Sequence, residues 1–243
     1  MYTYYIIDMV LTLKEIQYGF YINLLHRSDR KEQVENELRS IGLENIPRFN
    51  AISMPNGRIG CTMSHLRCLE IAKQEKWSHV LIVEDDIQFL EPAMFTNQIN
   101  KFLSSGVNWD VILLAGNNLP PYSRISDYAI KVMQCQTTTG YIVNGHYIDR
   151  LIENIREGLQ RLIREQEKHY YYAIDKYWFR LQQKDKWFLI TPLTVTQRAG
   201  FSDIEQKKTD FTKAMTDLDK HALMMRYKKH NIYGNTIDIV DPK

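Results

Sequence analysis

Two kinds of hydrophobic pattern alternate along the chain. Short uninterrupted apolar runs, bounded by polar or turn residues, predict buried strands, and apolar residues that recur every three or four positions predict amphipathic helices. The predicted strands cover residues 18–25, 47–52, 79–86, 109–116, 128–135, 139–143 and 187–193. The predicted helices cover 27–40, 60–76, 147–167 and 173–183, and the polar region after residue 201 is also expected to be mainly helical.

Strands that alternate with helices predict an α/β fold with an open sheet. In such sheets ligands bind beyond the carboxyl ends of the strands. Residues 23–30, 84–86 and 116–118 follow three of the predicted strands. We therefore expect the ligand site to be built from these segments.

Composition narrows the function only a little. The chain has 243 residues, 44% of them hydrophobic and 25% charged, which allows one large domain. Its formal net charge of +2 gives no global attraction to nucleic acid, so no nucleic-acid partner is expected. The apolar N-terminus is interrupted by Asp8 and lacks a basic segment, and no later run reaches membrane length. We expect a cytoplasmic protein that works in solution or beside a membrane.

The three cysteines are odd in number, and their spacing fits neither a zinc motif nor a disulfide framework. They are interpreted as buried free thiols, which favours a reducing compartment.

Three consecutive carboxylates, Glu84, Asp85 and Asp86, end the most apolar predicted strand. Like charges crowded together raise one another's pKa unless a cation neutralises them. Carboxylates suit Mg²⁺, Mn²⁺ or Ca²⁺, and the first two ions commonly bridge protein carboxylates and substrate phosphates. The triplet therefore indicates a nucleotide diphosphate site, with a solvated acidic turn as the open alternative.

A basic segment follows the first predicted strand, where Arg27 and Arg30 flank Asp29. Ser28 or Asp29 can cap the next helix, and a helix N-terminus with nearby arginines favours phosphate. On these residues alone, an ordinary charged helix start explains the pattern better.

Three motifs in series resemble glycosyltransferase family 25: INLLHRSDR at 22–30, GRIGCTMSH at 57–65 and LIVEDD at 81–86. That family includes bacterial lipooligosaccharide galactosyltransferases and collagen hydroxylysine galactosyltransferases. His26 stands where the family usually has the first arginine of a pair, which leaves Arg27 in that role. GFSDIE at 200–205 also resembles the Ser-Asp pair near the end of the family's domain.

The resemblance implies a GT-A-type fold, a UDP-galactose or UDP-glucose donor, inversion at the anomeric carbon, and Mn²⁺, with Mg²⁺ as the other candidate ion. Among the triplet we expect Asp86 to hold the metal, assisted by Glu84 or Asp85, with Glu84 as the less direct partner. The alternative for one member of the triplet is to hold the ribose hydroxyls. The residues expected around the donor are Asn23, Arg27, Arg30, His65, Glu84, Asp85 and Asp203. For His65 a purely structural role stays open, and for Asp203 a loop turn stays open.

The acceptor side is expected to include Asp175, which lies in the aromatic segment YYYAIDKYWF. The resemblance makes it the candidate general base, and the alternative is an ordinary acid in the first turn of a helix. A glycan, a glycolipid or a collagen-like protein is the expected acceptor, in a bacterial or viral setting. The basic stretch at 226–230 is a solvated face or a peripheral contact with anionic lipid.

Residues 18–205 are predicted to form the glycosyltransferase domain, after an N-terminal extension at 1–17 and before a C-terminal helical segment and tail at 206–243. Two other functions stay open. A metal-dependent phosphohydrolase or nucleotidyltransferase shares the need for carboxylates, although such enzymes usually converge more acids on two metals. A degenerate, non-catalytic nucleotide-sugar-binding module is the second alternative.

Overall fold

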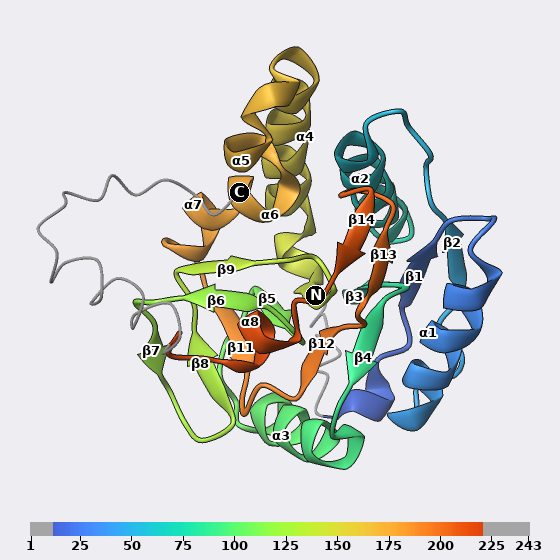
Figure 1. The fold of residues 1–243 in the computed structure, drawn as a ribbon. Coiled ribbons are helices and arrows are strands. Elements are labelled where there is room, and N and C mark those ends of the chain that lie inside the picture. The colour runs from blue at the N-terminus through green and yellow to red at the C-terminus, as the bar shows by residue number, and fades with distance from the viewer. Residues whose placement is uncertain (1–11, 221–243) are drawn as a thin grey trace, which may run out of the picture.

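An eight-stranded mixed sheet forms the centre of the computed structural model, which describes residues 12–220 (Figure 1). Its strand order is β2-β1-β3-β10-β5-β11-β8-β7. These strands are β1 (Gly19–Asn23), β2 (Arg48–Asn50), β3 (His79–Glu84), β5 (Val111–Leu113), β7 (Ser123–Arg124), β8 (Ala129–Lys131), β10 (Gly140–Asn144) and β11 (Trp187–Ile190). β1 runs parallel to β2 and β3, whereas β10 runs antiparallel to its neighbours β3 and β5. The carboxyl ends of β1 and β3 therefore meet at one edge of the sheet.

Helices cover both faces of this sheet, which confirms the predicted α/β class with an open mixed sheet (Figure 1). One face packs against α1 (Ser28–Ser40), α3 (Pro92–Ser104), α8 (Thr212–Thr216) and the 3₁₀ turn η1 (Leu13–Glu15). The other packs against α2 (Gly57–Gln74), α4 (Ile148–Arg164), α6 (Ile174–Tyr177) and α7 (Phe179–Gln182). Successive side chains of a strand point to opposite faces, so Leu81 and Val83 join the first core and Val80 and Ile82 the second.

Three two-stranded ladders flank the main sheet. They are β4 (Ile87–Phe89) with β12 (Val195–Gln197), β6 (Asn117–Leu119) with β9 (Gln134–Gln136), and β13 (Gly200–Ser202) with β14 (Lys207–Thr209). β12 pairs antiparallel with β4, and its register sets Gln197 opposite Ile87. Because Ile87 directly follows the acidic triplet, this pairing carries a distant segment to the end of β3.

The segments before and after α4 are short. The 3₁₀ turn η2 (Gly145–Tyr147) enters α4, and η3 (Gln166–Lys168) with α5 (His169–Tyr172) follows it. Among the helices between residues 12 and 220, none combines the length and apolar character needed to cross a bilayer.

The strand predicted at 128–135 is two strands, β8 and β9, and β9 leaves the main sheet. Helical side chains capture its backbone: Gln182 Oε1 accepts from Cys135 N at 2.7 Å, and Trp178 Nε1 donates to Cys135 O at 3.0 Å. The helix predicted at 173–183 is divided at Trp178 into α6 and α7. The sequence prediction also omitted α3, whose buried Phe95, Ile99 and Phe102 recur at helical spacing.

The mainly helical structure predicted after residue 201 is wrong for the residues up to 209, which complete the β13–β14 hairpin. Its turn is set by Ser202 Oγ, which accepts from Glu205 N at 3.1 Å, and by Gln206 at a φ of 52°. The predicted domain end at residue 205 falls inside this turn. In the predicted N-terminal extension, Leu13 and Ile16 are buried in the core. The basic stretch at 226–230 lies outside the described residues.

Candidate active site

The parallel strands β1 and β3 bring the first and third sequence motifs side by side. Ile22 on β1 pairs in register with Glu84 on β3, so Asn23 stands beside the acidic triplet. Asp85 and Asp86 form the turn from β3 into β4, and α1 begins at Ser28, just beyond β1. These candidate residues therefore lie together at the carboxyl ends of β1 and β3.

Asp85 is held by two donors from the first motif. Asn23 Nδ2 donates to its Oδ2 at 2.7 Å, and Arg30 donates through one guanidinium nitrogen to its Oδ1 at 2.9 Å. Asn23 Nδ2 also donates to the carbonyl of Arg27 at 3.0 Å. Burial raises the pKa of Asp85 in spite of these partners, since only 8% of the residue is exposed. This carboxylate fixes the end of β1 and the start of α1 against β3.

Asp86 has a different environment. Its Oδ2 lies 3.6 Å from the Arg30 guanidinium, and its Oδ1 is buried without a hydrogen-bond partner among the described residues. Its backbone carbonyl accepts from Arg198 N at 2.6 Å, which holds the turn. Burial, together with the charge of Glu84, raises the pKa of Asp86 to about 8. A cation would satisfy both the free oxygen and the crowded charge.

Glu84 collects donors from several elements. Its Oε1 accepts from Thr138 Oγ1 at 2.8 Å, lies 3.2 Å from His65 Nε2 and accepts from Cys61 Sγ at 3.5 Å. Its Oε2 accepts from Gln197 Nε2 at 3.5 Å. Burial alone would raise the pKa of Glu84, but His65, Thr138 and Cys61 keep that pKa below its ordinary value. Glu84 is therefore held as a carboxylate.

His65 is completely buried, so its contact with the site runs through Glu84. Its other ring nitrogen, Nδ1, lies 2.9 Å from the hydroxyl of Tyr141, and the two rings stack with centroids 5.7 Å apart. Cys61 stands one helical turn before His65 on α2. The sequence analysis treated Cys61 as an ordinary buried thiol. The signal that it missed was the four-residue spacing of Cys61 and His65 in a helix that packs on the acidic strand.

The β13–β14 hairpin carries Asp203 to the basic segment. Arg27 donates to Asp203 Oδ2 at 2.6 Å and also pairs with Asp29 at 2.9 Å. Arg30 donates to the carbonyl of Phe201 at 2.8 Å. The structure thus joins Arg27 and Asp203, which are far apart in the sequence. Both arginines reach the site already engaged with protein acceptors.

Asp175 lies in the first turn of α6, and the loop between β9 and β10 links it to Glu84. The backbone N–H of Thr137 donates to Asp175 Oδ2 at 3.1 Å, while the next residue, Thr138, donates to Glu84. Thr137 has a φ of 77°, which is an uncommon conformation for a β-branched residue and typical of a constrained site. Burial raises the pKa of Asp175, and the charge of Glu84 contributes.

The donor atoms fit a divalent cation. The free buried oxygen of Asp86 and the nearby carboxylate of Glu84 are hard ligands, as Mn²⁺ and Mg²⁺ prefer. A second group of possible ligands consists of Cys61, His65 and Glu84, whose donor atoms all lie within 4.8 Å of one another.

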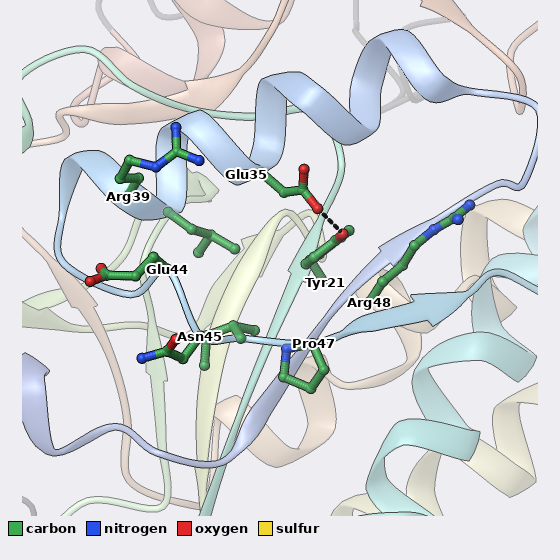
Figure 2. Close-up of a pocket in the computed structure, with 9 residues that line it drawn as sticks. Tyr21, Glu35, Arg39, Glu44, Asn45, Pro47 and Arg48 are labelled. Carbon is green, nitrogen blue, oxygen red and sulfur yellow. Dashed lines mark hydrogen bonds between the residues drawn. The ribbon is translucent and has the colours of Figure 1, made fainter.

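A hollow of about 460 Å³ opens elsewhere, between α1, β1 and the segment that leads into β2 (Figure 2). Figure 2 shows Tyr21 and Glu35 joined across it, by a hydrogen bond of 2.5 Å. Lys31 also donates to Glu35, at 2.7 Å. No residue of the predicted donor site lines this hollow, and we do not assign it to the reaction.

Comparison with known proteins places these residues in context. The model of glycosyltransferase family 25, described as an LPS biosynthesis protein family, matches residues 50–178. A procollagen lysyl hydroxylase and glycosyltransferase of Acanthamoeba polyphaga mimivirus is 25% identical, over 55% of this chain and 20% of that protein. A glycosyltransferase 25 family member of Drosophila pseudoobscura pseudoobscura is 27% identical, over 55% of this chain and 26% of that protein. The chain thus matches only about a fifth to a quarter of these relatives' lengths.

Among solved structures, the mannose-1-phosphate geranyltransferase of Thermus thermophilus has a TM-score of 0.39 and 8% sequence identity. The match covers 71% of this chain and 73% of that one. A likeness this distant does not identify a reaction.

Proposed function

Because the chain belongs to glycosyltransferase family 25, we propose that it transfers a hexose, galactose or glucose, from a UDP-sugar to an acceptor hydroxyl. The acceptor is a glycan, a glycolipid or a collagen-like protein. The observation that carries the proposal is Asp86, whose buried oxygen has no hydrogen-bond partner among the described residues, beside Arg30 at the carboxyl ends of two parallel strands. An unpaired carboxylate oxygen next to a guanidinium supports a site that binds a cation and a diphosphate together.

Different residues are proposed to bind different parts of the donor. Asp86 and, less directly, Glu84 would hold Mn²⁺ or Mg²⁺, which when bound stabilises charge on a departing diphosphate. Arg27 and Arg30 add positive charge from the start of α1. Asp85 keeps Asn23 and Arg30 in place through the two hydrogen bonds to its carboxylate.

Two further residues complete the proposed donor site. His65 orients Glu84 from behind, because its buried ring reaches the site only through that carboxylate. Asp203 holds Arg27 from the β13–β14 hairpin. His65 therefore acts on the donor through Glu84, and Asp203 acts on it through Arg27.

The proposed transfer inverts the anomeric carbon. The acceptor oxygen forms a bond to C1 as the bond from C1 to the β-phosphate oxygen breaks, and that electron pair leaves with UDP. Asp175 accepts the hydroxyl proton as general base. Its raised pKa brings it closer to the range useful for proton transfer near neutral pH. The Thr137 N–H keeps its carboxylate aimed from the start of α6.

The test is a calorimetric titration with UDP-galactose, UDP-glucose, UDP-N-acetylglucosamine and GDP-mannose, each with and without Mn²⁺. We expect Mn²⁺-dependent binding of one UDP-hexose that is lost in Asp86→Ala. It should persist in Asp127→Ala, which removes an exposed carboxylate whose ion pair is with Lys101 on α3.

Two other outcomes separate the rival functions. Release of inorganic phosphate from nucleotide without sugar transfer would favour a phosphohydrolase, because that chemistry needs no acceptor hydroxyl. Tight UDP-sugar binding without turnover on any acceptor class would favour a non-catalytic module. Absence of binding by any uridine nucleotide, with Mn²⁺ present and the protein folded, would reject the donor site.

A further inference from the structure

Three different ligand types converge beside the proposed donor site. Cys61 Sγ, His65 Nε2 and Glu84 Oε1 come from α2 and the end of β3, and all lie within 4.8 Å of one another. We propose that they form a second cation site, with a preference for Zn²⁺ and similar ions, and that an ion bound there competes with the donor-site cation for the carboxylate of Glu84. The second half of this statement rests on the proposed function, and the first half does not.

The distances suit a tetrahedral zinc ion. With Zn–S bonds of about 2.3 Å and Zn–N and Zn–O bonds of about 2.0–2.2 Å, tetrahedral geometry separates sulfur from oxygen by about 3.5 Å and nitrogen from oxygen by about 3.4 Å. In the structure Cys61 Sγ lies 3.5 Å and His65 Nε2 lies 3.2 Å from Glu84 Oε1. Two of the three donor pairs therefore already have tetrahedral spacing, and the third pair, Cys61 Sγ and His65 Nε2, lies within 4.8 Å.

Rigid elements hold these ligands. Cys61 and His65 are four residues apart on α2, so both side chains leave the same face of the helix, toward β3. The third ligand is fixed as well, because Thr138 Oγ1 donates to Glu84 at 2.8 Å. Ligands on helices and strands keep their geometry better than ligands on loops.

A further contact orients the imidazole. The Tyr141 hydroxyl lies 2.9 Å from His65 Nδ1. When an ion replaces the Nε2 proton that His65 otherwise shares with Glu84, this hydroxyl can accept a hydrogen bond from Nδ1–H and leave the Nε2 lone pair to the ion. Metal-bound histidines characteristically use their second nitrogen in this way. Tyr141 is fully buried, which prevents water from replacing it.

Ligand chemistry separates this site from the Asp86 site. Thiolate and imidazole favour Zn²⁺ over Mn²⁺ or Mg²⁺, whereas the oxygen of Asp86 suits the harder ions. Binding replaces the proton of the Cys61 thiol, which leaves to solvent as the sulfur becomes a thiolate ligand. Cys61 is only partly buried as a residue, whereas His65 is fully buried.

The probe for the test is Co²⁺, which takes zinc sites and gives a thiolate-to-metal charge-transfer absorption. Titration of the metal-free full chain should give a saturable charge-transfer band in the wild type. The band should vanish in Cys61→Ser and persist in Cys68→Ser, the matched control, which removes another buried thiol of α2. Tyr141→Phe should weaken Co²⁺ binding about 10- to 100-fold, the usual effect of removing a hydrogen bond to a metal-bound histidine.

A wild type without the band, or a band that survives in Cys61→Ser, would overturn the site, with circular dichroism confirming that each variant is folded. Asp86→Asn should keep the band, and its loss there would mean one shared site and would also overturn the proposal. Zn²⁺ should weaken Mn²⁺-dependent UDP-sugar binding in the wild type. A wild type that gives the band but binds no UDP-sugar would reject the proposed function and leave this cation site standing.

Discussion

Asp85 and Asp86 are adjacent in the sequence and face two different environments. Toward β1 and α1, both oxygens of Asp85 accept hydrogen bonds, from Asn23 and Arg30. Toward the other side, Asp86 has one distant cation at 3.6 Å and a buried oxygen without a hydrogen-bond partner among residues 12–220. Both oxygens of Asp85 are therefore hydrogen-bonded within the protein, and one buried oxygen of Asp86 is not.

This difference indicates how to separate framework from site in an acidic cluster. A buried carboxylate whose two oxygens both accept hydrogen bonds stabilises the fold, because removing it leaves its buried donors unpaired. A buried carboxylate with an unused oxygen destabilises the metal-free protein unless a ligand arrives. The open side also includes Glu84, which the loop at Thr137 and Thr138 connects to Asp175.

The largest effect is expected at Asp175, which the loop at residues 137–139 links to Glu84. Asp175→Asn should lower kcat by about 10²- to 10⁴-fold, the usual contribution of a general base, because the amide cannot accept the acceptor's proton. Donor affinity, measured by calorimetry, should change little. Asp149→Asn is the control, since Asp149 is an exposed acid in the first turn of α4. A kcat within a few-fold of wild type would remove Asp175 from the reaction.

Substitution of Asp85 should mainly lower the stability of the protein. Asp85→Ala should lower the free energy of unfolding by about 3–5 kcal/mol, because it leaves the Arg30 guanidinium and the Asn23 amide without their shared acceptor. Urea denaturation monitored by circular dichroism measures this loss. Asp29→Ala, at an exposed carboxylate, should cost less than about 1 kcal/mol. An equal loss of unfolding free energy in the two variants would contradict a structural role for the hydrogen bonds of Asp85.

The neighbouring substitution should behave in the opposite way. Asp86→Asn should lower kcat by about 10²- to 10³-fold, the scale expected when one stabiliser of developing charge is removed. It should leave the free energy of unfolding of the metal-free protein unchanged or raised, because it removes a carboxyl group whose ionised form is disfavoured by burial and by Glu84. Steady-state assays with Mn²⁺ and urea denaturation without metal give the two values. A destabilisation as large as that of Asp85→Ala would erase the distinction between the two carboxylates.

The sequence predicted most of the fold, for reasons that are local. Four consecutive buried apolar residues made β3 evident, and the recurrence of Val34 and Leu38 made α1 evident. The break between β8 and β9 was not visible, because the side chains that capture Cys135 come from α6–α7, 43 and 47 residues later. The β13–β14 hairpin was missed because polar residues with no clear periodicity form it.

The arrangement of the candidate site was also predictable only in part. The motifs predicted which segments meet, and the structure joins Asn23, Arg30 and Asp85 at the ends of adjacent strands. The sequence did not show that His65 is buried and contacts Glu84, because the rotation of α2 on the sheet decides which residues face β3. The different partners of Asp85 and Asp86 also depend on the turn geometry, which three like residues in a row do not reveal.

Glu70 is a surface carboxylate that can be compared with Asp85. Its substitution should have the smallest effect on stability. Glu70 also has two cationic donors, Arg156 of α4 at 2.7 Å and Arg67 at 3.2 Å, but its side chain is 26% exposed. Arg156 and then Arg67 hold the pKa of Glu70 below its ordinary value of 4.5, against burial. A carboxylate with a depressed folded-state pKa stabilises the protein above its unfolded-state pKa, and this contribution is lost as pH falls through the folded-state value.

Wild type should therefore exceed Glu70→Gln by no more than about 1 kcal/mol in free energy of unfolding at neutral pH. The difference should shrink as pH falls below 4.5 and should also shrink with added salt, because the pair is partly exposed. Urea denaturation of both proteins from neutral to acidic pH measures it. A difference that stays constant into acid would mean that Glu70 acts through packing between α2 and α4. A difference near that expected for Asp85→Ala would mean that burial is not what separates a structural carboxylate from a surface one.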